Sequence, residues 1–218
     1  MIPAFQSRIL LASVLAAVAA GSAFAGTGST ANYVPCGSSE GANSKGIFTS
    51  LVTYTYSGSG TSASVSVLLT NTTLLANGGF ITGLAVNPDP NATSLVFNSC
   101  TNAAFIDCGS PVTASPFGNF VAGAALGGDW LGGGSPNAGI AVGSSATFNF
   151  TISGSAALLG AMTAEDVFDE ENDRALVVRF RGGVGGWSDK VLGCAAPAPG
   201  ALALLGVAGV AGARRRRA

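Results

Sequence analysis

The stretch Ala146–Ser153 carries the most restrictive pattern in this chain, because apolar and polar residues alternate along it without a break. Phe148, Phe150 and Ile152 fall on one side, and hydroxyl or amide side chains fall on the other. Successive side chains of a β-strand point to opposite faces, whereas a helix repeats about every 3.6 residues. The alternation therefore predicts a strand with one buried face.

Comparable runs recur along the chain, and each is bounded by Gly, Pro or Asn. The further expected strands are Ile47–Tyr56, Ser62–Thr70, Phe80–Val86, Leu95–Phe97, Ala138–Val142 and Ala175–Arg181. About eight short strands separated by such turns predict an all-β fold, a single β-sandwich of jelly-roll type.

One or two short helices are expected beside these strands. Ala156–Gly160 is predicted to form one helical turn. The segment Thr163–Asp166 resembles a capping box, which predicts that a second short helix starts at Ala164.

Two glycine-rich segments are predicted to be irregular. Gly26–Ser44 is expected to be a mobile start that Cys36 anchors to the domain. Pro111–Pro136 is expected to be a long connection, with Trp130 packed onto the core.

The N-terminus has the layout of a secretory signal peptide. Arg8 supplies the positive charge, Ile9–Ala20 is apolar, and Ala23 and Ala25 form an A-x-A cleavage site. Cleavage there would remove residues 1–25 and predicts export.

The C-terminus, residues 197–218, has three parts. A short opening is followed by the uncharged run Ala201–Ala213 and then by four arginines. The 17 residues from Pro197 to Ala213 reach the lower limit for a membrane-spanning helix, and consecutive arginines stop translocation on the cytoplasmic side. The opening consists of Pro197, Ala198, Pro199 and Gly200, and the basic end of Arg214, Arg215, Arg216 and Arg217.

This three-part arrangement resembles the PEP-CTERM sorting signal of Gram-negative bacteria. In that family a Pro-Glu-Pro motif precedes a short transmembrane helix and a basic terminus, and here Ala198 stands in place of the Glu. The resemblance implies that a membrane-embedded exosortase recognises Pro197–Gly200. It also implies transient anchoring in the inner membrane, delivery to the cell surface or extracellular matrix, and association with exopolysaccharide.

Residues 26–196 are expected to form one extracellular domain between these signals. Arg8 and the four terminal arginines account for five of the ten basic residues, whereas all eleven acidic residues lie in the domain. Its net charge is therefore −6. Because nucleic acid binding needs a basic face, the charge argues against nucleic acid as a partner.

Four cysteines allow three disulfide pairings, and an exported location permits disulfides. The favoured pairs are Cys100–Cys108, which closes a short local loop, and Cys36–Cys194, which would tie the two ends of the domain together. The absence of histidine and of CxxC spacing argues against a zinc site.

Six carboxylates fall within nine residues. Calcium prefers such oxygen ligands, but the DxDxDG order of an EF-hand is absent. A calcium site and a solvated acidic start of a helix both remain open interpretations. The six residues are Glu165, Asp166, Asp169, Glu170, Glu171 and Asp173.

The chain has no histidine, which removes His-dependent triads and nearly all catalytic zinc sites. Walker, GxSxG and dinucleotide-binding motifs are also absent. The expected function is therefore that of a non-enzymatic surface or matrix protein. Two alternatives are a carbohydrate-binding module that stacks sugars on Trp130 or Trp187, and a hydrolase that uses two carboxylates.

Overall fold

The computed structural model describes residues 27–170 and 174–196. It is 51% strand and 7% helix, which confirms the all-β prediction. The strands are β1 (Thr27–Ser38), β2 (Phe48–Tyr56), β3 (Ser62–Asn71), β4 (Gly78–Val86), β5 (Ser94–Cys100), β6 (Phe105–Asp107), β7 (Val112–Thr113), β8 (Asn119–Phe120), β9 (Ala122–Leu126), β10 (Ser145–Ser153), β11 (Leu176–Gly183) and β12 (Asp189–Ala195). The helical elements are α1 (Ala156–Ala161) and the 3₁₀ turns Gly41–Asn43 and Pro136–Ala138.

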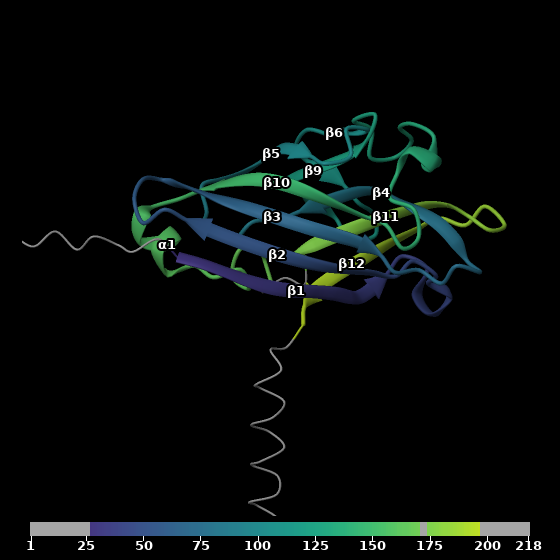
Figure 1. The fold of residues 1–218 in the computed structure, drawn as a ribbon, viewed down its shortest axis with the longest axis horizontal. Coiled ribbons are helices and arrows are strands. Elements are labelled where there is room, and N and C mark those ends of the chain that lie inside the picture. Colours follow the sequence, from purple (N-terminus) through teal and green to yellow (C-terminus); the bar gives the residue numbers. More distant parts are fainter. Residues whose placement is uncertain (1–26, 171–173, 197–218) are drawn as a thin grey trace, which may run out of the picture.

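Ten of these strands form one antiparallel sheet, in the order β5-β10-β3-β2-β1-β12-β11-β4-β9-β6. Figure 1 shows β10, β3, β2 and β1 side by side in one layer, with β4 and β11 crossing behind them. The far edges of the sheet approach each other, because β5 contacts β6 and β9. The predicted sandwich thus consists of one continuous sheet folded over, and its two halves are joined where β1 pairs with β12.

Both halves of the sheet line one apolar core. Val67 and Phe150 contribute from the first half, and Leu84 and Val178 contribute from the second. Aromatic pairs reinforce the packing: the rings of Phe105 and Phe148 meet edge to face, with 5.0 Å between their centroids.

The outer faces of the two halves differ. A second apolar cluster covers the outer face of β4, β9 and β11, so β4 and β9 are buried on both sides. The β7–β8 hairpin and Trp130 supply this cover. Within residues 27–170 and 174–196, no such cover lies over the first half, and β2 and β3 alternate between buried and solvent-facing residues.

The prediction of a mobile start over Gly26–Ser44 is wrong, because β1 lies in the middle of the sheet. β1 pairs with β2 on one side and with β12 on the other. Ala31 and Tyr33 face the core and alternate with exposed Asn32 and Val34. Ala31 and Tyr33 are the only two inward apolar side chains in this alternation. The strand was missed because the rest of the segment is polar and rich in glycine.

The strand predicted at Ala138–Val142 is also wrong. A 3₁₀ turn at Pro136–Ala138 precedes Gly139, and only Ile140 joins the sheet, through one bridge to Ile81. A side chain on Gly139 would approach the Ile81 carbonyl oxygen to 2.2 Å, so the close passage of the two backbones depends on glycine.

One of the two predicted helices forms. The turn expected at Ala156–Gly160 is α1, and Ser155 caps it by accepting a hydrogen bond from the Leu158 amide at 3.1 Å. At Thr163 the hydroxyl donates to Asp166 at 2.7 Å, but the chain makes a turn there instead of a helix. Phe168 is buried and forms a β-bridge with Pro88. This contact holds the segment after the turn in an extended conformation against the domain, so no helix forms there.

We expect Phe148→Ala to lower the free energy of unfolding by about 3–5 kcal/mol, because it leaves a cavity beside Phe105 in the core. Thr49→Ala on the solvent-facing side of β2 is the control, with a change within about 0.5 kcal/mol. Urea unfolding measures both. A loss below about 1 kcal/mol for Phe148→Ala would contradict the packing described here.

Candidate functional site

The last strand, β12, is held on both sides. It lies between β1 and β11, with Cys194 opposite Val34 and Gly193 opposite Leu176. One residue further, the Ala196 amide donates to the Asn32 carbonyl at 2.7 Å. The point where the chain leaves the domain toward Pro197 is thus a central strand and not a sheet edge. We call β12 and the residues that fix its two ends the tail base.

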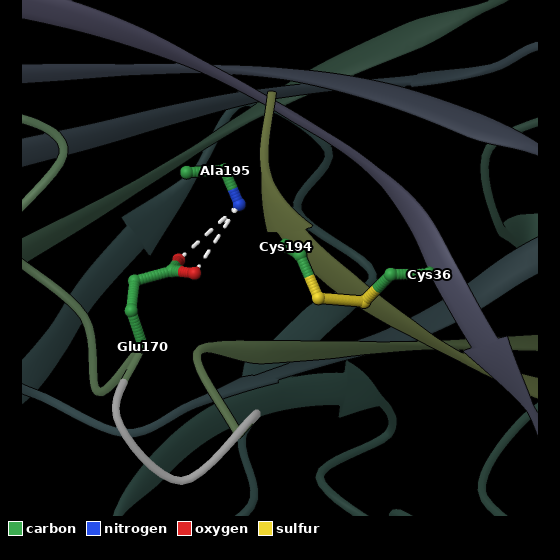
Figure 2. The surroundings of a disulfide bond; sticks show 4 residues. All are labelled: Cys36, Glu170, Cys194 and Ala195. Atoms are coloured by element: carbon green, nitrogen blue, oxygen red, sulfur yellow. Dashed lines mark hydrogen bonds between the residues drawn. A yellow bond between two sulfur atoms is a disulfide. The ribbon is translucent and has the colours of Figure 1, made fainter. Parts of the chain in front are cut away.

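A disulfide joins the tail base to the first strand. Cys36 and Cys194 are bonded, with 5.8 Å between their Cα atoms and a sequence separation of 158 (Figure 2). The β1–β12 register shifts between Pro35 and Gly37, so Cys36 lies at a bulge in β1. The predicted Cys36–Cys194 pair is confirmed.

The acidic segment docks against the same place. Figure 2 shows the Glu170 carboxylate facing the Ala195 amide, which donates to its two oxygens at 3.3 and 3.4 Å. The buried Tyr33 hydroxyl donates to the Glu165 carbonyl at 3.2 Å. Burial and the nearby Glu170 charge raise the pKa of Tyr33, so this hydroxyl stays a donor.

The other end of β12 is fixed by a buried carboxylate that the sequence did not single out. Asp189 is 2% exposed and accepts hydrogen bonds from three serine hydroxyls. Ser38 and Ser44 donate at 2.7 Å, and Ser39 donates at 3.2 Å. This clasp joins the loop after β1 to the start of β12. A lone Asp at the start of a strand gives no signal of it, because its partners lie far away in sequence.

A cavity of about 320 Å³ next to the tail base is lined by five carboxylates. Some of them already stabilise turns: Asp166 accepts from the Thr163 hydroxyl, and Asp89 accepts from the Asn91 amide at 2.7 Å. The five residues are Asp89, Glu165, Asp166, Asp169 and Glu170.

The structure gives the calcium hypothesis no direct support. Among residues 27–170 and 174–196, no group of three or more His, Cys, Asp or Glu side chains is arranged to hold a metal ion. Two of the six predicted ligands, Glu171 and Asp173, lie outside the described residues. Calcium binding therefore stays a prediction.

The two tryptophans of the carbohydrate-binding alternative differ in exposure. Trp130 is 5% exposed, as predicted for a side chain packed onto the core, and its indole N–H has no hydrogen-bond partner among the described residues. Trp187 is partly buried near Phe180 and donates to the Asn77 carbonyl at 2.9 Å. Trp130 is therefore too buried to stack a sugar. Trp187 also lines a cavity of about 310 Å³ with Lys45 and Ser188, and sugar stacking on it stays a prediction.

The predicted Cys100–Cys108 disulfide is not formed. Both cysteines are free thiols and are partly buried. Cys100 packs on the main core and Cys108 on the second apolar cluster, so nearness in sequence does not bring the two sulfurs together. Burial raises the pKa of both thiols, that of Cys108 to about 11.

The predicted processing residues lie outside the described part of the chain. These are the cleavage residues Ala23 and Ala25, the motif Pro197–Gly200, and the basic end Arg214–Arg217. Within the described part, no helix is long and apolar enough to cross a membrane.

No protein-family model matches this chain, and neither a curated protein nor a solved structure is significantly similar to it.

Alkylation without reduction distinguishes the two disulfide patterns. We expect iodoacetamide to modify Cys100 and Cys108 in the denatured, unreduced protein and to leave Cys36 and Cys194 unmodified. Peptide mass spectrometry identifies the modified residues. Complete protection of all four cysteines would contradict the free thiols and restore the pairing expected from sequence.

Removing the disulfide should destabilise the domain strongly. Because the bond spans 158 residues, Cys36→Ser with Cys194→Ser is expected to lower the free energy of unfolding by about 4–5 kcal/mol. Cys100→Ser with Cys108→Ser is the matched control and should cost less. Equal losses in the two double variants, measured by urea unfolding, would show that the disulfide is not a main constraint.

Proposed function

We propose that this chain is an exported, non-enzymatic protein of the cell surface or extracellular matrix that carries a C-terminal exosortase sorting signal. In this proposal the signal peptide directs export and is cut after Ala25. The tail then holds the protein in the inner membrane until an exosortase-like enzyme acts at Pro197–Gly200. The domain is delivered to the envelope or to extracellular polysaccharide.

The Cys36–Cys194 disulfide is the observation that supports this proposal best. Structural disulfides persist in oxidising compartments outside the cytoplasm, as an exported domain requires. This one closes the domain between its first and last strands, three residues before Pro197. A cut at the motif would leave β12 and its partners intact, because Ala195 and Ala196 are already fixed by Glu170 and Asn32.

A second, weaker candidate is a hydrolase that uses two carboxylates. The observation that favours it is the cavity lined by Asp89, Glu165 and Asp166, which gathers several carboxylates in one place. Release of reducing sugar from polysaccharide, abolished by Glu165→Gln and by Asp166→Asn, would favour it.

The intact mass of the protein in cell and medium fractions of its native host tests the sorting proposal. We expect a form that begins at Gly26 and ends near Pro197–Gly200. Pro197→Ala with Pro199→Ala is expected to keep the tail and remain cell-associated, whereas Thr49→Ala should be processed normally. Retention of Arg214–Arg217 in every fraction would show that the exosortase proposal is wrong.

A further inference from the structure

The five strands β5, β10, β3, β2 and β1 contain no Asp, Glu, Lys or Arg. All five basic and all eleven acidic residues of 26–196 lie elsewhere in the chain. We call the outward side of these strands the neutral face. Among the described residues, no loop cluster covers this half of the sheet, and Figure 1 shows its strands lying side by side.

Hydroxyl and amide side chains form regular rows across the neutral face. In the central row, Thr30 of β1 lies opposite Thr53 of β2, which lies opposite Ser66 of β3, which lies opposite Asn149 of β10. The row on one side repeats this chemistry, with Thr55, Ser64 and Thr151 in register, whereas the row on the other side has Leu51 opposite Leu68. Because adjacent strands are about 4.8 Å apart, the rows present donors and acceptors at a short, constant spacing.

Hydrogen bonds between strands hold these side chains in place. The Ser66 hydroxyl donates to Asn149 at 3.2 Å, and the Asn149 amide donates to the Ser99 hydroxyl at 3.2 Å. In the next row Asn98 donates to the Thr151 hydroxyl at 2.9 Å. Each hydroxyl can still form a further hydrogen bond with an external partner. The rows are therefore ordered and still able to hydrogen-bond a ligand.

This composition excludes several classes of partner. A nucleic acid, an anionic lipid surface or an acidic polymer needs cations, and the neutral face has none. Protein interfaces are anchored by Trp, Tyr or Arg and are poor in Ser. The outward apolar residues here are aliphatic and few, such as the opposed pair Leu51 and Leu68. An uncharged polymer rich in hydroxyl groups matches the face in both charge and hydrogen bonding.

We propose that the neutral face binds an uncharged polysaccharide chain. The neutral face has no aromatic ring on which a sugar could stack, so hydrogen bonds and the methyl groups of Thr hold each sugar weakly. Affinity comes from many sugars of one chain that contact successive rows. Long chains should therefore bind where short ones do not, and binding should not depend on salt. The proposal rests on the proposed function only in placing the polymer outside the cell.

Retention of the purified full-length protein on polysaccharides tests this proposal. The neutral probes are microcrystalline cellulose, cross-linked dextran and curdlan, and alginate is the anionic comparison. We expect retention on at least one neutral polymer at both low and high salt. We also expect competition by long soluble chains of the same polymer and none by its disaccharide.

Charge placed on the neutral face should weaken retention. Thr53→Glu with Ser66→Glu is expected to weaken it about tenfold or more, and Thr55→Glu with Ser64→Glu provides a second, independent variant. Ser59→Glu in the exposed β2–β3 turn is the matched control and should bind normally. Equal melting temperatures confirm that the variants are folded.

Four results would overturn the proposal. The first two are no retention on any neutral polymer and retention on alginate alone. The third is retention that persists in both charged double variants. The fourth is dimerisation of the protein through the neutral face, which the charged variants would abolish. Retention is measured on purified protein, so it does not depend on tail processing in the host. If the tail is processed correctly but the purified protein is not retained, the neutral-face proposal alone is wrong. Retention with an uncut tail would count against the sorting proposal alone.

Discussion

The pairing of β1 with β12 is the interaction on which the rest of the structure depends. It is the place where the two halves of the sheet are hydrogen-bonded to each other, and it joins the first described strand to the last. The Cys36–Cys194 bond fixes the same contact covalently. The chain between them is thereby closed into one loop, which limits the unfolded state and favours a single folded sheet.

The arrangement also determines how a load on the tail would reach the domain. A pull on Pro197 acts on β12, which is bonded to β1 and β11 along its length. Its start is fixed by the serines around Asp189, and its end is fixed by Glu170. The strand would have to break its bonds to two neighbours together, whereas an edge strand has only one neighbour to lose. Such a base would suit the C-terminal sorting proposed above.

The sequence predicts those elements whose side chains form a local pattern, and it does not predict contacts between residues that are distant in sequence. β10 and β3 were predictable because large apolar residues alternate with hydroxyls, and β10 differs from its prediction by one residue. β9 (Ala122–Leu126) was missed because its alanines and glycine are buried on both faces and show no period. The Asp189 clasp and the docking of Glu170 depend on contacts distant in sequence, which no local pattern encodes.

Hydrogen exchange of the β12 amides, Val191–Ala195, tests the central claim most directly. With the disulfide intact, these amides should exchange in the slowest class, together with those of β2 and β3, and reduction should accelerate them before the β3–β10 amides. Exchange of β12 as fast as that of the turn 183–187 in the oxidised protein would contradict the account. It would show that the last strand is not part of the stable sheet.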